Sequence, residues 1–221
     1  MQYFSEEYLE HHGILGQKWG VRRFQNKDGS LTRAGRKRFE EAMNNKIIAN
    51  GSIPKGTKLY RVTIRKNDPA FGNRKYFSLN KWDNAQWQDR WDEARAYGNK
   101  QDVKLYGVVY KTTKELKIAN SKVLEEKMMS YIKNNQKSFV KQYRELLDET
   151  GYNHNQLATA SRMALLFIAA NKPLGNKFLN EIEKDGYGAI EDDLGRDVAF
   201  NPIIVISPDN ATKRTIFTER H

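Results

Sequence analysis

Two side chains and one acidic stretch have types and positions that could do chemistry. Arg61 lies in the middle of an alternating segment, 58–64, where a guanidinium could clamp a phosphate through two hydrogen bonds. Ser78 lies at the end of the next short apolar segment, and residues 185–193 (DGYGAIEDD) end in three acids that begin at Glu191. A fixed carboxylate there could hold a substrate hydroxyl or a cation, or offset positive charge that develops during a reaction. Each feature also has a structural explanation, because a strand arginine often only covers apolar surface with its stem.

The first forty residues carry a charge pattern unlike the rest of the chain. Between Lys18 and Arg38 there are eight lysines and arginines and a single acid, Asp28. The residues expected to contact a partner are His11, His12, Lys18, Trp19, Arg22 and Arg23. Such a segment fits a phosphate backbone or an acidic protein surface, and the simpler alternative is a solvated basic surface.

The histidines do not suggest a metal site. The chain has four histidines and no cysteine, so there is neither a thiolate ligand nor a disulfide framework. His11 and His12 are adjacent, and neighbours on a strand point to opposite faces. No carboxylate or third histidine stands at ligand spacing, so we expect no bound metal.

Composition limits the class of protein. The chain has 221 residues, of which 38% are hydrophobic and 29% charged, and its formal net charge is +11. The longest apolar run, 164–170, is far shorter than the roughly 20 residues that cross a bilayer. Glu6, Glu7 and Glu10 stand where a secretory signal needs basic and then apolar residues. We expect a soluble protein made in a cytoplasm, with no membrane partner.

Hydrophobic periodicity divides the chain into helices and strands. Helices are predicted at 33–48, 83–97, 122–134, 139–147, 157–170 and 178–183. Strands are predicted at 58–64, 75–79, 103–111, 115–119, 188–191, 202–207 and 214–218. The run 203–206 is continuously β-branched, so that strand is expected to be central and covered on both faces.

This order of elements predicts an α+β fold. The expected architecture is a small mixed sheet of non-contiguous strands with a central helical insertion, preceded by a basic N-terminal segment. Residues 1–50 would form the docking segment and first helix, and residues 51–221 the α+β domain.

Four short motifs in the body are similar to those of the ADP-ribosyltransferase family. They are LYRV at 59–62, YFSLN at 76–80, GYGAI at 186–190, and IIVIS at 203–207 followed by Pro208. The resemblance covers about residues 58–218 and implies an ADP-ribosyltransferase-like fold that uses NAD as substrate.

The same resemblance implies roles for individual residues. Arg61 would grip the dinucleotide, Ser78 would support the pocket, and Glu191 would stabilise an oxocarbenium-like transition state. Aromatic rings would stack on nicotinamide or adenine. The residues implied in NAD binding besides Arg61 are Tyr60, Tyr76 and Trp82.

The chain departs from the family pattern at two places. The position of the family glutamate, before the last apolar strand, holds Asn201 or Pro202, neither of which carries negative charge. Ser78 is followed by Leu79 and Asn80 rather than by Thr-Ser. The acid could therefore come from any of residues 191–193, and the resemblance leaves open both an active transferase and a form that has lost activity.

The front of the chain resembles a motif of phage and prophage proteins. The stretch HHGILGQKWGVRRFQNKDGSLTRAGRKRF, residues 11–39, is similar to a segment of head-associated and effector proteins, except that Arg33 replaces a proline. This resemblance implies a phage-encoded protein, carried with the phage head, that is found in the virion or the host cytoplasm and acts on a host target. The alternative is a non-enzymatic protein that binds head proteins or packaged DNA through its basic N-terminus, or that inhibits host defence.

Overall fold

A computed structural model describes the chain except for residues 1–23, 64–66, 68–73, 82–104, 198–200 and 221. The predicted helix at 83–97 therefore lies outside the described residues. Residue contacts divide the chain into two compact units, Met1–Ala42 and Met43–His221, and the boundary falls within helix α1 (Arg33–Asn50).

The described part of the first unit is a closed loop that leads into α1. Gln25 and Leu31 form an isolated antiparallel bridge, and the Thr32 amide donates to the Phe24 carbonyl over 2.9 Å. Thr32 then caps α1, because its hydroxyl accepts the amide hydrogen of Gly35 at 3.1 Å. A Cβ atom on Gly35 would overlap the Phe24 carbonyl, so only glycine allows the loop to pack this closely.

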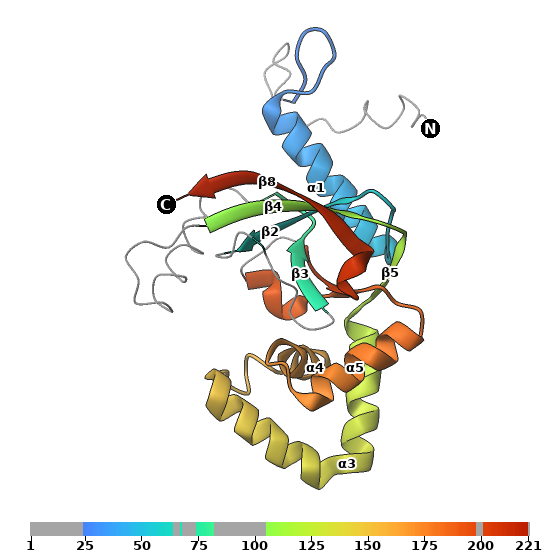
Figure 1. The fold of residues 1–221 in the computed structure, drawn as a ribbon, viewed down its shortest axis with the longest axis vertical. Coiled ribbons are helices and arrows are strands. Elements are labelled where there is room, and N and C mark those ends of the chain that lie inside the picture. The colour runs from blue at the N-terminus through green and yellow to red at the C-terminus, as the bar shows by residue number, and fades with distance from the viewer. Residues whose placement is uncertain (1–23, 64–66, 68–73, 82–104, 198–200, 221) are drawn as a thin grey trace, which may run out of the picture. The chain divides into compact units, whose positions relative to one another are not determined.

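The second unit is built on one sheet of eight strands in the order β1-β5-β6-β7-β3-β2-β4-β8. The strands are β1 (Ser52–Ile53), β2 (Lys58–Thr63), β3 (Arg74–Ser78), β4 (Leu105–Thr112), β5 (Leu116–Ala119), β6 (Ala189–Glu191), β7 (Pro202–Ile206) and β8 (Ala211–Arg220). All neighbours are antiparallel except β5 and β6, so the sheet is mixed (Figure 1).

The sheet is sparsely paired between β2 and β3, and we name this place the opening. Among the described residues these strands share one register pair, Tyr60 with Ser78, whereas β2 and β4 share six and β3 and β7 share five. The opening divides the sheet into a three-stranded antiparallel part, β2-β4-β8, and a five-stranded mixed part, β1-β5-β6-β7-β3.

Two hydrophobic cores cover the two faces of the five-stranded part. On one face, Ile190, Ile204 and Ile206 pack against the helices α3 (Ser121–Thr150), α4 (Ala160–Ala169) and α5 (Pro173–Lys184). On the other face, Phe77 and Ile203 join a core to which both parts of the sheet contribute. All five residues of β7 are buried, as the continuous apolar run predicts.

The helices begin and end at residues suited to those positions. The Asn120 side chain accepts the amide of Val123 at the start of α3, and Gly151 takes a left-handed conformation, φ 72°, at its end. The two helices predicted at 122–134 and 139–147 are confirmed as the two segments of α3, which a kink at the non-helical Asn135 separates. Pro173 begins α5, where its missing N–H costs nothing.

The predicted α+β fold with a mixed sheet is confirmed. The strands of the sheet come from 52–119 and 189–220, and the helices α3, α4 and α5 lie between these stretches in the chain. Figure 1 shows these helices together on one side of the sheet. Strand β1, which is two residues long, was not predicted.

The close contact of α4 and α5 makes Gly175 essential. A Cβ atom at this position would overlap the Phe167 carbonyl. Gly175→Ala should therefore lower the free energy of unfolding by about 1–3 kcal/mol, although alanine is the better helix former. Urea denaturation would measure the change, and Ala169→Ser, which adds one atom at an exposed position of α4, is the control. An unchanged or raised stability in Gly175→Ala would contradict the packing described.

Candidate functional site

Arg61 lies at the opening of the sheet. It pairs with Val108 on β4 and shares a face with Leu59, two residues earlier on β2. Its Nη1 atom donates to the Tyr76 carbonyl oxygen on β3 over 3.1 Å. The guanidinium thus joins β2 to β3 beyond the single backbone pair of these strands.

A second cation spans the same opening. Lys75 on β3 is 6% exposed, and its Nζ atom donates to the Tyr110 hydroxyl on β4 over 2.9 Å. The ammonium also lies over the Tyr110 ring, 4.6 Å from its centroid. Lys75 therefore ties the two parts of the sheet together, and neither its type nor its spacing singled it out in the sequence.

Glu191 lies in the same lateral row of the sheet as Arg61. It pairs with Ile203 on β7, and Ile203 pairs with Phe77 on β3. Because Tyr60 pairs with Ser78, the next position of β2, Arg61, aligns with Phe77. Residues in one row point to the same face, so Arg61 and Glu191 share a face, three strand spacings or roughly 14 Å apart along the backbone. Two buried apolar side chains, Ile203 and Phe77, stand between them.

Ser78 belongs to the opposite face and serves a turn. It is 1% exposed, and its hydroxyl donates to the Asn80 carbonyl at 2.8 Å and accepts the Asn80 amide at 3.1 Å. Alternation along β3 places Ser78 on the face opposite Phe77. The structure therefore brings Arg61 and Glu191 to one face and Ser78 to the other.

The two described aromatic residues of the predicted set both lie on the face of Ser78, opposite Arg61. Tyr60 is the register partner of Ser78, and Tyr76 packs against the core that includes the helices. The Tyr76 hydroxyl lies 3.4 Å from Nε of Arg74, and burial raises the pKa of the Tyr76 phenol above its usual value. Trp82 lies outside the described residues, as do all six residues of the predicted N-terminal contact set.

Arg74 is a buried cation that sequence reasoning missed. It is 0% exposed, and its Nη1 atom donates to the Asn171 side-chain oxygen over 3.0 Å. Asn171 has a positive φ of 56°, which asparagine tolerates better than most residues. The two residues are 97 positions apart, so no local pattern could have indicated this contact.

The three consecutive acids have three different environments. Glu191 ends β6, and Asp193 accepts from Nε of Arg162 at 3.0 Å. Asp192 is 8% exposed and accepts the Gly195 amide at 3.1 Å. Burial raises the pKa of the Asp192 carboxyl to about 6, against hydrogen bonds from the backbone of Gly195 and Leu194 that lower it.

A neutral amide occupies the position next to Ser78. Pro202 is the register partner of Ser78, and the Asn201 carbonyl accepts the amide of the following residue, Leu79. The Asn201 side chain donates to Asn80 over 3.2 Å and to Asn45 over 2.9 Å. Asn201 therefore holds α1 and the end of β3 together, and it supplies no negative charge to this position.

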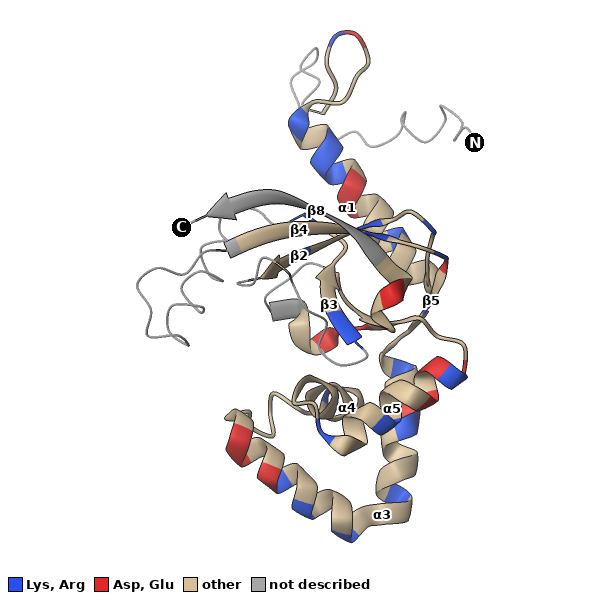
Figure 2. Ribbon diagram, in the orientation of Figure 1, with Lys and Arg blue, Asp and Glu red and all other residues tan. Residues whose placement is uncertain are grey.

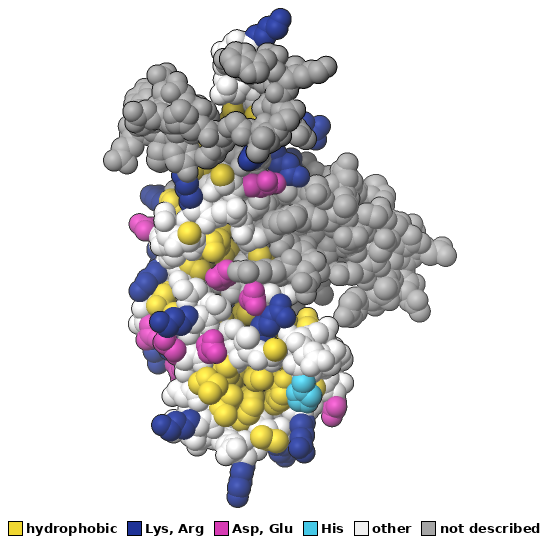
Figure 3. All heavy atoms as spheres, turned by 180° about the vertical axis from the view of Figure 1, so that it is seen from behind, with side chains coloured by type: hydrophobic (Ala, Val, Ile, Leu, Met, Phe, Trp, Pro, Cys, Tyr) yellow, Lys and Arg dark blue, Asp and Glu magenta, His cyan; other side chains and the backbone are white. Residues whose placement is uncertain are grey.

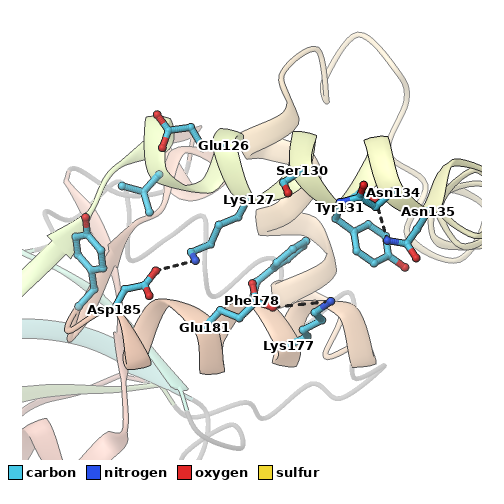
Figure 4. A pocket seen from close by; sticks show the side chains of 12 residues that line it. Glu126, Lys127, Ser130, Tyr131, Asn134, Asn135, Lys177, Phe178, Glu181 and Asp185 are labelled. Carbon is cyan, nitrogen blue, oxygen red and sulfur yellow. Dashed lines mark hydrogen bonds and ion pairs between the residues drawn. The ribbon is translucent and has the colours of Figure 1, made fainter.

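A polar groove of about 500 Å³ lies between α3 and α5 (Figure 4). Phe178 and Tyr131 meet edge to face along it, with ring centroids 6.1 Å apart. Lys127 pairs with Asp185 at 2.8 Å, and Lys177 lies 3.8 Å from Glu181. Because a carboxylate already accompanies each lysine, the groove offers an anionic ligand no uncompensated cation.

The described residues offer neither a metal-binding cluster nor a membrane-spanning helix. Within the described ranges, no group of three or more histidines and acids is placed to hold a metal ion. None of the helices in the described part of the chain has the length and apolar character needed to span a bilayer. Figure 3 shows apolar side chains gathered on one surface of the helical part. Met129 and Val140 on α3 are 54% and 40% exposed.

Comparison with protein-family models, with curated proteins and with solved structures finds no match to this chain. The candidate site therefore depends on the residues described above: Arg61 and Lys75 at the opening, and Glu191 in the row that leads from it.

Replacing Asp192 should make stability less dependent on pH. The unfolded pKa is near 3.8 and the folded pKa about 6, so the folded state holds the proton more tightly. Wild-type stability should consequently fall as pH rises from about 4 to about 6, and then level off. Asp192→Asn keeps an acceptor for the Gly195 amide and should raise the free energy of unfolding near neutral pH by about 3 kcal/mol, with little effect near pH 4.

Urea denaturation of both proteins across this pH range would measure the difference. Asp148→Asn, which changes an exposed carboxylate on α3, is the control. If Asp192→Asn proved no more stable than wild type near neutral pH, the burial of this carboxyl would not have the stated effect.

Proposed function

We propose that the second unit is an ADP-ribosyltransferase-like domain that binds NAD at the opening between β2 and β3. The chain would be a phage-encoded protein, carried with the phage head, that acts on a host target. One observation supports this proposal above the others. The sheet opens between the two strands that carry Arg61 and Ser78, and these strands share only one register pair.

The opening offers groups that suit a dinucleotide. Arg61 already donates a hydrogen bond to a neutral carbonyl, that of Tyr76. A phosphate would accept from the same guanidinium through charge-assisted bonds, which are stronger than a bond to a neutral carbonyl. Lys75, whose ammonium spans the opening, adds positive charge near the second phosphate. Tyr60 lies on the opposite face of β2 from Arg61, as its pairing with Ser78 requires, so it does not belong to this set of groups.

The acids set how fast the bound NAD reacts. Glu191 shares a face with Arg61, but two buried apolar residues separate their positions. The position next to Ser78 is occupied by Asn201 and Pro202, which cannot offset positive charge on a ribose. In this proposal Glu191 supplies the carboxylate, and the domain binds NAD more readily than it cleaves it.

Loss of the guanidinium should weaken NAD binding. Calorimetric titration of the full chain with NAD should give a measurable affinity, which Arg61→Ala should lower about 10- to 100-fold, as expected for a charged hydrogen-bonding group worth about 1.5–3 kcal/mol. Lys58→Ala, which removes an exposed cation from the same strand, should leave the affinity within about threefold. Absence of binding by the wild-type chain, or equal losses in the two variants, would exclude the proposed site.

A separate measurement addresses the carboxylate. Release of nicotinamide from NAD should be slow in the wild-type chain and about 100-fold slower in Glu191→Gln, while NAD affinity stays nearly unchanged. Glu125→Gln, at an exposed position of α3, is the matched control. A rate that survives in Glu191→Gln would show that this residue does not supply the negative charge.

A further inference from the structure

The first unit presents an exposed phenyl ring on α1, where four basic residues precede the ring and Glu40 and Glu41 follow it. Phe39 on α1 is 57% exposed, the largest exposed fraction among the large apolar side chains of the described residues. Figure 2 shows basic residues along the first half of the same helix. The first turn of α1 holds no acid, although the positive end of the helix dipole would favour one. Cations without acids at the start of a helix would destabilise it if it were isolated. The basic start of α1 therefore needs a reason other than helix stability.

Two arginines on either side of Phe39 are held in place by the loop that precedes α1. Arg36, three residues before Phe39 and on the same side of the helix, donates from Nη1 to the Leu31 carbonyl over 2.7 Å. Arg38, which flanks Phe39, places its guanidinium over the Phe24 ring, 5.0 Å from the centroid. Both side chains therefore lose conformational freedom before any partner arrives.

The loop itself is fixed by short-range contacts. The Asp28 carboxylate accepts from both the amide and the hydroxyl of Ser30, at 3.0 and 2.7 Å. The Asn26 side chain donates to the Ser30 hydroxyl at 2.9 Å. Together with the Thr32 cap and the close approach at Gly35, these bonds keep the loop against the helix. The result is a helix start on which two guanidinium groups are held against the preceding loop, followed by the exposed ring of Phe39.

We propose that this Arg36–Phe39–Arg38 surface docks on a protein partner that has acidic side chains around an apolar pocket. Aromatic rings and arginines are the side chains that most often dominate the binding energy of protein interfaces. Phosphate contact alone would leave the phenyl ring in water, whereas a pocket would bury it. The surface lies in the first unit, so the inference is independent of the NAD site.

Fluorescence anisotropy with the full chain would test this docking surface. The first probe is a dye-labelled acidic peptide with two leucines among glutamates, and the second is a dye-labelled DNA duplex of about 20 base pairs. Phe39→Ala should weaken peptide binding at least tenfold, and Arg36→Gln and Arg38→Gln should each weaken it severalfold. Met129→Ala, at an exposed apolar position of α3, and Lys37→Gln, on the far side of α1, should change it little.

Three results would overturn the inference. The first is no binding of the peptide by the wild-type chain, and the second is peptide binding that survives in Phe39→Ala. The third is binding of the duplex alone, with a steep dependence on salt and no effect of Phe39→Ala, which would assign the surface to nucleic acid. Because Phe39 is exposed, its replacement should leave the fold intact, and circular dichroism of each variant would verify this.

Discussion

Burial of β7 on both faces constrains the rest of the second unit. Ile204 and Ile206 face the helices and Ile203 and Val205 face the core between the two parts of the sheet, each worth about 1.5–3 kcal/mol when removed from water. A charged side chain inside this strand would lose its hydration. The strand is apolar throughout, although its register partners on β3 include two buried cations, Arg74 opposite Ile206 and Lys75 opposite Val205. Glu191 lies beside the strand, at the end of β6.

The opening of the sheet follows from how pairing is shared among its strands. Every residue of β3 pairs with β7, and every residue of β2 pairs with β4. Backbone pairing therefore holds each part of the sheet together without help from the other part. Between β2 and β3, side chains take over from backbone pairing: Arg61 binds a carbonyl of β3, and Lys75 reaches a hydroxyl of β4. Side-chain donors can exchange partners more easily than a continuous ladder can, which is the physical basis for proposing a ligand site at this place.

Local sequence predicted most elements because periodicity and end signals are local. The continuous run of β7 and the glycine at the end of α3 are of this kind. The break at Asn135 falls between the two predicted helices, although neither proline nor glycine marks it. Helix α5 begins at Pro173, five residues before the predicted start at 178, because proline suits the first position of a helix. The site was predicted only in part, because the row from Arg61 to Glu191 depends on the register of four strands.

The loop before α1 stabilises the start of this helix and leaves Phe39 exposed. A start of α1 without acids and with several cations is unfavourable, and an exposed Phe39 adds to that cost. The Thr32 cap and the contact at Gly35 offset it by satisfying an amide of the first turn and by closing the loop on the helix. These contacts stabilise the surface that carries Phe39 without burying it. The close approach of the Phe24 carbonyl explains the glycine, and the docking surface proposed above would explain the exposed ring.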